Sequence, residues 1–379
     1  MGLLLGVVFL SIPPALSELK AIYRASYTEI SVLVSSLLWS HAAVQIPAGM
    51  IADRWGIRRT LLMSLMCIGV GNAIPGFLPE LGLAIVGRAI SGVGTGLSFV
   101  TVMKMIALHA PGGRTGSYQA FFAGFFSLGS ILAYLAIPTL IRYAWNCSYL
   151  VPALWSVPLA AYLMRLPLKA SAPSSPPSVP LGHVLRIPLG WILGVYHAIS
   201  YGSMLSLGNW IPSLLAEVSG DTATQLAWGG ALVMLVSGLG RLSGGFVLLR
   251  CSPLLIANAS MAIISVLFLC LFLIPIHMPV LILALSAAWF SSINFGAFFH
   301  LASHAALPQS LGTFFGFINF LANLGTILFT LMFGWVKDAT GSFSWGFGLM
   351  ACLSFLSFLL GHGPLERHSS EPPRAFSAS

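Results

Sequence analysis

One arginine lies inside a strongly apolar stretch of the sequence, in the run Gly238-Leu-Gly-Arg241-Leu-Ser-Gly-Gly245. A charged side chain within a membrane helix is costly and marks a functional site by default. A guanidinium binds a carboxylate or a planar oxyanion through two parallel hydrogen bonds, which an ammonium does not reproduce. Arg241 is therefore a candidate binding group for a small anion. The alternative is that Arg241 donates to backbone carbonyls or extends toward the aqueous surface.

Other polar side chains in apolar stretches could complete such a site. All nine Asp and Glu residues fall at the ends of apolar segments, in loops or in the tail. No carboxylate is therefore expected opposite the arginine. The candidate substrate-binding residues are Arg241, Gln45, Asn319, Asn323, Asn294 and Tyr201.

Four histidines are the titratable candidates within apolar segments. His41 and His197 lie near the middle of two segments, where an imidazole can carry a proton near neutral pH or act as a packing residue. His300 and His304 are four positions apart, but a metal site needs more than two ligands. We expect no metal and no cofactor, and no clustered acid, base or nucleophile suggests an enzyme.

The composition places these residues in a membrane protein. Of 379 residues, 57% are hydrophobic and 7% are charged, whereas soluble domains carry about 25% charged residues. The net charge of +8 comes mostly from basic residues at the ends of apolar segments. These residues are better explained as topology signals than as a nucleic-acid surface. The five cysteines show no CxxC spacing, so neither a zinc site nor a disulfide framework is indicated.

The apolar segments number twelve, and most are long enough to span a bilayer. We predict an N-terminal six-helix bundle at 1–166, a cytoplasmic linker rich in proline and serine at 167–187, a C-terminal six-helix bundle at 188–361 and a disordered cytoplasmic tail at 362–379. The predicted segments lie at about 1–16, 27–51, 59–79, 82–106, 117–141, 147–165, 188–212, 224–249, 253–275, 279–304, 310–336 and 342–361.

The two halves repeat each other at one offset. Leu128-Gly-Ser-Ile-Leu132 matches Leu324-Gly-Thr-Ile-Leu328, which lies 196 positions later. The same offset carries Gly49 to Gly245, Arg54 to Arg250, and Gln45 to Arg241. Gln45 lies eight residues before Asp53, or roughly 12 Å along a helix, so this pair of positions is near the middle of the bilayer.

The offset also bears on the start of the chain. Met1 corresponds to His197, although the seventh segment begins near Pro188. We therefore expect the first helix to lack about its first third, through a late start codon or a truncated chain.

A short basic loop separates the second and third segments, and its residues are Gly49, Asp53, Arg54, Gly56, Arg58 and Arg59. Gly49 allows two helices to approach closely, and Gly56 can adopt the positive φ of a tight turn. The arginines mark the cytoplasmic side. Asp53 is expected either to form an ion pair or to cap the N-terminus of a helix.

This loop resembles the signature loop between helices 2 and 3 of the major facilitator superfamily, with the pattern G-x-x-x-D-R/K-x-G-x-R/K-R/K. The resemblance implies an all-α membrane protein with twelve transmembrane helices in two pseudo-symmetric six-helix bundles, which rock about a central site. The run Gly87-Arg88-Ala-Ile-Ser-Gly92-Val-Gly94-Thr-Gly96 is similar to a second motif of the family. That motif implies a buried Arg88 facing helix 1, and the alternative is an arginine that extends toward the surface.

Local resemblances bear on the substrate. The fifth segment lacks the Gly-Pro of proton-coupled drug antiporters. Gln45-Ile-Pro-Ala-Gly49 together with Arg241 resembles nitrate/nitrite porters, which carry paired arginines in helices 2 and 8. Here Gln45 stands at the helix 2 position, and a lone arginine in helix 8 is similar to carboxylate carriers of the same superfamily.

We therefore expect a secondary active transporter of a small solute, an anion such as a carboxylate or an inorganic oxyanion, working by alternating access. The alternatives are proton-coupled efflux or uptake of a neutral or drug-like solute, and a transport-inactive membrane sensor. We expect a monomer in the plasma membrane with both termini cytoplasmic. Its partners would be a small-molecule substrate, a coupling ion and the lipid bilayer, with no nucleic acid.

Overall fold

The computed structural model describes residues 1–12, 15–25, 27–111, 113–166, 181–219, 228–274 and 279–370. Within these residues the regular structure is helical, which confirms the predicted all-α class. The helices of the first half are α1 (Gly2–Leu10), α2 (Leu16–Tyr23), α3 (Tyr27–Trp55), α4 (Ile57–Phe77), α5 (Leu81–His109), α6 (Thr115–Leu140) and α7 (Cys147–Arg165). Those of the second half are α8 (Leu181–Leu185), α9 (Pro188–Ser219), α10 (Trp228–Val247), α11 (Pro253–Leu273), α12 (Pro279–Ile293), α13 (Phe295–Ala305), α14 (Leu311–Thr340) and α15 (Ser344–Ser370).

Ten helical stretches of the described chain are long and apolar enough to cross a membrane. The first predicted helix is not among them, because α1 has only 9 residues. The seventh predicted helix, α9, is not among them either. It has 32 residues but carries polar side chains in its middle, among them His197 and Ser200. Helices α12 and α13 together form one stretch, Val280–Ala305, which is interrupted at Asn294.

Two boundaries differ from the prediction. Helix α8 forms at the end of the segment 167–187 that we predicted as a linker, because its residues follow the last proline of the run, Pro180. Helix α15 continues to Ser370, beyond the predicted end at about 361, through good helix formers such as Leu365 and Glu366. Residues 167–180 of the predicted linker and 371–379 of the predicted tail lie outside the described residues.

The chain divides into two compact units. Unit 1 contains Met1–His109, Phe122–Leu181 and Pro308–Phe317, and unit 2 contains Ala110–Phe121, Gly182–Leu307 and Ile318–Ser379. Each unit thus holds most of one half of the sequence and the first turns of one helix from the other half. Those turns begin at Thr115 in α6 and at Leu311 in α14, which are 196 positions apart, so the two exchanged segments are equivalent by the repeat.

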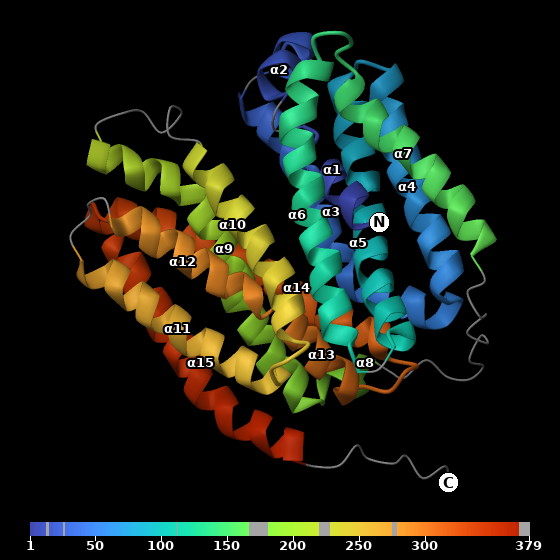
Figure 1. Ribbon diagram of the computed structural model, residues 1–379. Helices are drawn as coiled ribbons and strands as arrows, with labels where there is room; N and C mark the ends of the chain where they lie inside the picture. The colour runs from blue at the N-terminus through green and yellow to red at the C-terminus, as the bar shows by residue number, and fades with distance from the viewer. Residues whose placement is uncertain are drawn as a thin grey trace. The chain divides into compact units, whose positions relative to one another are not determined.

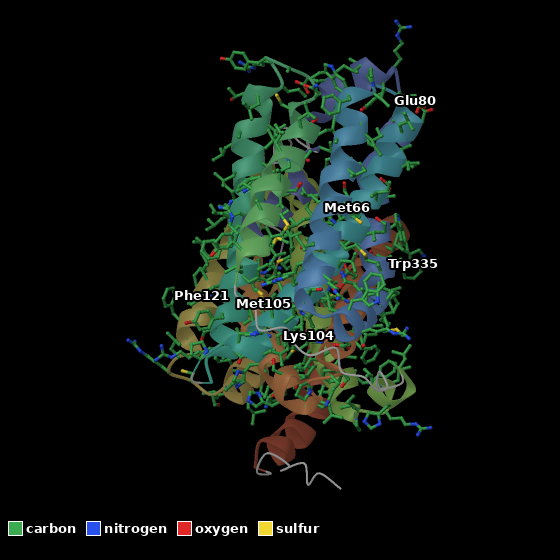
Figure 2. All side chains as sticks on the ribbon, turned by 90° about the vertical axis from the view of Figure 1, so that its right-hand side faces the viewer. Met66, Glu80, Lys104, Met105, Phe121 and Trp335 are labelled. Atoms are coloured by element: carbon green, nitrogen blue, oxygen red, sulfur yellow. The ribbon has the colours of Figure 1, made fainter. Side chains whose placement is uncertain are left out.

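In unit 1, α5 packs against α3 and α4, and α4 lies alongside α7 (Figure 1). Small residues allow these contacts: a methyl group at Gly87 would overlap the backbone of Gly71. A side chain caps the N-terminus of α5. At its N-terminus the carboxylate of Glu80 accepts from the N–H groups of Gly82 and Leu83 at 2.9 and 2.8 Å. Lys104 lies near the opposite end (Figure 2).

In unit 2, α11 lies alongside α15, and α10 packs against α9 and α12 (Figure 1). The face of α10 toward α12 consists of Gly240 and Gly244, where added methyl groups would overlap the backbone of Trp289 and Ile293. Glycines four positions apart share a helix face and bring two backbones together. This contact fixes the position of α10. Arg241, the residue after Gly240, therefore lies against α9 and α13.

Candidate functional site

Arg241 is buried among aromatic and apolar side chains of unit 2. Its side chain is 6% exposed. The guanidinium carbon lies 5.7 Å from the ring centre of Tyr201 and 5.5 Å from that of Phe295. Nη2 is 3.7 Å from the sulfur of Met204, and Nε is buried without a hydrogen-bond partner among the described residues. The described residues therefore supply aromatic faces to the cation but no oxygen acceptor.

No carboxylate neutralises this guanidinium within the part of the chain that the structure describes. The salt bridge found there joins Lys104 and Asp53, both in unit 1. Contacts with the two aromatic faces offset part of the cost of burial, but a buried charge without an ionic partner still costs several kcal/mol. The arrangement agrees with neither alternative for Arg241, since no backbone carbonyl of the described residues accepts from it and its side chain is buried.

His197 and Asn319 adjoin this arginine site. The His197 ring packs 5.7 Å from Tyr201 and 5.5 Å from Phe295, measured between ring centres, and its side chain is within hydrogen-bonding reach of Asn319. Phe295 and Met204 were not predicted. Met204 lies three positions after Tyr201 on α9, so helical spacing would have found it. Phe295 follows a helix break that the sequence does not reveal.

Two of the predicted substrate-binding residues are engaged away from the guanidinium. The amide of Asn294 donates to the Ser200 hydroxyl at 3.0 Å, between the end of α12 and the middle of α9. The amide of Asn323 donates to the backbone carbonyl of Asn319, four residues earlier in α14, at 2.8 Å. These residues contact Arg241 through no hydrogen bond in the structure.

The equivalent position in unit 1 belongs to a polar group of three residues. Gln45 is fully buried, and its Nε2 lies 2.7 Å from Nε2 of His41. His41 Nδ1 lies 3.0 Å from the hydroxyl of Thr95 on α5, and that hydroxyl donates to the Gly92 carbonyl at 2.8 Å. The remaining amide oxygen, Gln45 Oε1, is buried and has no hydrogen-bond partner among the described residues.

Asp53 makes both of the interactions that were predicted as alternatives. Its Oδ1 is 2.7 Å from Nζ of Lys104 and accepts from the Gly312 N–H at 2.9 Å, while Oδ2 accepts from the Thr313 N–H at 2.8 Å and from its hydroxyl at 2.6 Å. The carboxylate thus caps the N-terminus of α14, where the helix dipole favours a negative charge. The ionic partner is Lys104 and not one of the neighbouring arginines.

The other loop residues support this contact. A methyl group at Gly49 would overlap the backbone of Gly312, so α3 and α14 touch there through glycine. Gly56 has φ +82° and nothing within 4 Å of an added Cβ, as expected for a turn glycine. Arg58 donates to the Leu166 carbonyl at the end of α7. Arg54 and Arg59 are exposed.

Arg88 is buried, as the family motif implies. Its side chain is 1% exposed, and Nη1 donates to the Val8 carbonyl of α1 at 2.8 Å. The alternative of an arginine extended toward the surface is therefore wrong. This bond ties the short α1 to α5.

The second copy of the loop contact lacks its charges. By the offset of 196, Asp53 corresponds to Leu249 and Lys104 to His300. In unit 2 the Gly116 N–H, at the N-terminus of α6, donates to Nδ1 of His300 at 3.3 Å. A neutral imidazole thus occupies the place of the Asp–Lys pair.

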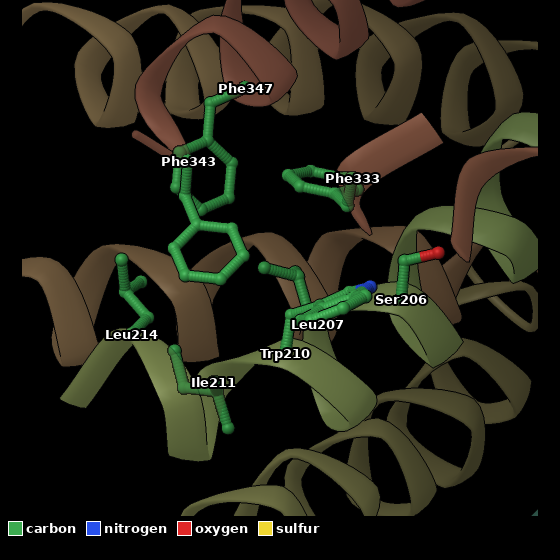
Figure 3. Close-up of a pocket in the computed structure, with 8 residues that line it drawn as sticks. All are labelled: Ser206, Leu207, Trp210, Ile211, Leu214, Phe333, Phe343 and Phe347. Atoms are coloured by element: carbon green, nitrogen blue, oxygen red, sulfur yellow. The ribbon is translucent and has the colours of Figure 1, made fainter. Parts of the chain in front are cut away.

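A separate pocket of unit 2 is apolar. It is lined by Ser206, Leu207, Trp210, Ile211 and Leu214 of α9 together with Phe333, Phe343 and Phe347 (Figure 3). The indole N–H of Trp210 donates to the Thr330 carbonyl at 3.1 Å. With no charged side chain in its lining, this pocket offers nothing to hold an anion.

Comparison with known proteins identifies the family of this chain. The family model of the Major Facilitator Superfamily matches residues 1–330. The chain is 23% identical to a probable sulfoacetate transporter of Cupriavidus necator over 86% of this chain and 82% of that protein. It is 21% identical to the cyanate transport protein of Escherichia coli over 96% of each, and 22% identical to a nitrite extrusion protein of Bacillus subtilis over 93% of this chain and 89% of that protein.

Solved structures show the same fold. The crystal structure of FucP, a Major Facilitator Superfamily transporter in the outward conformation, matches with a TM-score of 0.77 and 18% identity over 98% of each chain. The loop motif, the helical architecture and the family match agree, and the chain belongs to the major facilitator superfamily of multi-pass membrane transporters.

Proposed function

We propose that this transporter moves a small anion, either a carboxylate or an inorganic oxyanion, across the bilayer by alternating access. The observation that supports this substrate class is the buried guanidinium of Arg241, which has no carboxylate partner among the described residues. Among the described residues its Nε has no hydrogen-bond partner and its Nη2 contacts the sulfur of Met204, so both leave donors for a ligand. An anion bound in the fork of the guanidinium would supply the missing charge and acceptors.

The relatives support the same class. Those described above are named for sulfoacetate, cyanate and nitrite, all of which are small anions. A membrane enzyme is not a competing explanation, because this family consists of transporters. The neutral-solute alternative makes no use of the unpaired guanidinium.

Tyr201 and Asn319 would bind the rest of the solute, because Tyr201 lies beside the arginine and Asn319 beside its neighbour His197. Gln45, Asn294 and Asn323 are proposed as further contacts of the solute. In this structure each of them is bonded to another side chain or to a backbone group. We further propose a monomer in the plasma membrane with both termini cytoplasmic, and His41 or His197 as the carrier of a coupling proton.

Binding of a panel of anions to purified protein tests the proposal. The panel contains acetate, malonate, sulfoacetate, cyanate, nitrite and nitrate, with a neutral sugar and a cationic dye as comparators. At least one anion should bind to wild type, more weakly to Arg241→Lys and at least about tenfold more weakly to Arg241→Ala, since charge-assisted hydrogen bonds contribute about 1.5–3 kcal/mol.

Arg250→Ala is the matched control, because Arg250 is an exposed arginine just after α10. This variant should bind as wild type does. Binding of a neutral or cationic solute that survives Arg241→Ala, with no anion bound by wild type, would contradict the proposal. Anion binding without counterflow in proteoliposomes would favour the sensor.

A further inference from the structure

The first turns of α6 are held against α13 inside unit 2. A methyl group at Gly116 would overlap the carbonyl of Gly296, and a methyl group at Gly296 would overlap that of Gly116, so the two backbones touch. The Gly116 N–H donates to Nδ1 of His300 at 3.3 Å. The Gln119 amide donates to the Ser303 hydroxyl at 3.4 Å. His300 therefore supplies the acceptor for one of the N–H groups that the start of a helix leaves without a partner in the helix itself.

This bond requires one protonation state of His300. A backbone N–H can only donate, so Nδ1 of His300 must be the unprotonated nitrogen and Nε2 carries the hydrogen of the neutral ring. In the imidazolium both nitrogens are donors. Protonation would therefore place Nδ1–H against the Gly116 N–H, and the bond would be lost.

His304, one turn later on α13, has the opposite requirement. Its Nδ1 donates to the backbone carbonyl of His300 at 2.9 Å. That bond is compatible with a neutral ring and with an imidazolium, because Nδ1 carries a hydrogen in both. Of these two histidines, only His300 would lose its bond on taking up a proton.

The surroundings of His300 offer no anion to an imidazolium, within the part of the chain that the structure describes. Helices α9, α10, α11 and α12 and the first turns of α6 pack against α13. Their described ionisable side chains are Tyr196, His197 and Tyr201 of α9, Arg241 of α10 with Arg250 and Cys251 just after it, Cys270 of α11, and Arg114 and Tyr118 at the start of α6. None of these is a carboxylate, and the first turn of α6 holds no acidic residue. Because a helix N-terminus carries a partial positive charge, it would repel a cation at His300.

The equivalent contact of unit 1 is built with a different acceptor. Gly312 lies 196 positions after Gly116 and also begins a helix, and its N–H donates to the carboxylate of Asp53 at 2.9 Å. Leu249 stands at the position in unit 2 that corresponds to Asp53. The acceptor in unit 2 is instead an imidazole, the group whose charge ordinarily changes between about pH 5 and 8.

We propose that His300 makes the contact between α6 and α13 sensitive to pH: the neutral ring holds the first turns of α6, and proton uptake at Nδ1 releases them. A proton can reach the ring, because His300 is only half-buried and lies beside the exposed His304, with 4.6 Å between the ring centres. Acid on this side of the membrane would then free the start of a transport helix. The inference goes beyond the proposed function, since it holds whatever solute is carried.

Linkage gives the sign of the effect. The contact binds the neutral ring, so the free energy needed to release α6 falls as pH falls, and the population of the released state rises by up to about tenfold per pH unit. Hydrogen exchange of the full chain in nanodiscs measures this release as the protection of Gly116, corrected for the chemical exchange rate at each pH. Gly312 is the internal reference, because its acceptor is a carboxylate. Between pH 8 and 5, Gly116 should lose protection relative to Gly312.

Two variants of His300 separate the acceptor from its titration. His300→Asn should keep Gly116 protected at every pH, because the amide oxygen stands at the same bonded distance from the backbone as Nδ1 and takes up no proton in this range. His300→Leu should leave Gly116 weakly protected at every pH. His304→Asn is the matched control and should keep the pH dependence of wild type. Nitrogen NMR of histidine-labelled wild type should show protonation of His300 Nδ1 over the same pH interval as the release.

Three outcomes would overturn the inference. In the first, Gly116 and Gly312 of wild type keep the same relative protection from pH 8 to 5. In the second, the pH dependence persists in His300→Asn. In the third, it disappears in His304→Asn and not in His300→Asn. Because these measurements use no solute, each of the three would leave the proposed anion transport standing.

Discussion

Asp53 and Thr313 lie 260 positions apart in the sequence, and two hydrogen bonds join them: Oδ2 of Asp53 accepts from the backbone N–H of Thr313 at 2.8 Å and from its hydroxyl at 2.6 Å. The carboxylate is 3% exposed and also pairs with Lys104. A helix N-terminus, a lysine and a buried carboxylate therefore form one network. The network holds the start of α14 against the end of α3.

Replacing Asp53 by Asn should weaken this network without unfolding the protein. Asn keeps the volume and one acceptor but removes the charge, and hydrogen bonds to charged groups contribute about 1.5–3 kcal/mol. We expect a lower thermal midpoint and a reduced rate of counterflow in proteoliposomes. The double variant with Lys104→Met should lose less than the sum of the two single variants, since the two residues interact directly.

Arg54→Gln provides the control for Asp53→Asn, because Arg54 is adjacent in sequence but exposed. It should change the unfolding free energy by no more than about 0.5 kcal/mol. If Asp53→Asn transports at the wild-type rate, the loop has no part in the mechanism.

Replacing Gly49 by Ala should separate α3 from the start of α14. The added methyl group would overlap the backbone of Gly312, which no side-chain rotation can relieve. Overpacking of this kind costs about 1–3 kcal/mol. Thermal unfolding in detergent and counterflow in proteoliposomes should both be impaired. Gly182→Ala should behave as wild type, because an added Cβ there meets nothing within 4 Å, and equal effects of the two substitutions would refute the close contact.

Replacing Arg88 by Met should loosen α1. The Val8 carbonyl would lose its donor from Arg88 Nη1, at a cost of about 1–3 kcal/mol. Hydrogen exchange should become faster in α1 and remain unchanged in α11. Arg88→Lys should have a smaller effect, because an ammonium can still donate to that carbonyl. Unaltered exchange of α1 in Arg88→Met would show that the bond does not hold this helix.

Replacing His300 by Leu should weaken the contact at the N-terminus of α6. The Gly116 N–H would lose its acceptor, which corresponds to about 1 kcal/mol for a bond between neutral groups. The effect on the thermal midpoint should be smaller than that of Asp53→Asn, since the equivalent contact in unit 1 is charged. His304→Leu is the control, because His304 is exposed. A larger loss in His304→Leu than in His300→Leu would contradict this assignment.

Much of the fold was predictable because lipid imposes a simple rule on sequence. Long apolar runs can span lipid as helices that satisfy their own backbone hydrogen bonds, so the composition and these runs indicated membrane helices, and the family resemblance implied the all-α fold. The glycines of the loop were equally readable: Gly56 has the positive φ of a turn, and Gly49 touches another backbone. The ends of α8 and α15 were not predictable, because helix boundaries depend on weak local preferences.

The candidate site was only partly predictable. The repeat identified Gln45 and Arg241 as equivalent positions, since an offset in sequence requires no knowledge of packing. The repeat does not show which groups these two side chains contact. Arg241 contacts the rings of Tyr201 and Phe295 and has no carboxylate partner among the described residues, and Gln45 is bonded to His41.

The sequence by itself therefore determined the helices, the repeat and the residue types available for binding. Only the tertiary structure decided which of them are paired. Lys104 reaches Asp53 across 51 positions and the N-terminus of α14 reaches it across about 260. The pairing of a charged group depends on which helix faces meet, and helix faces meet through packing between segments that are distant in sequence.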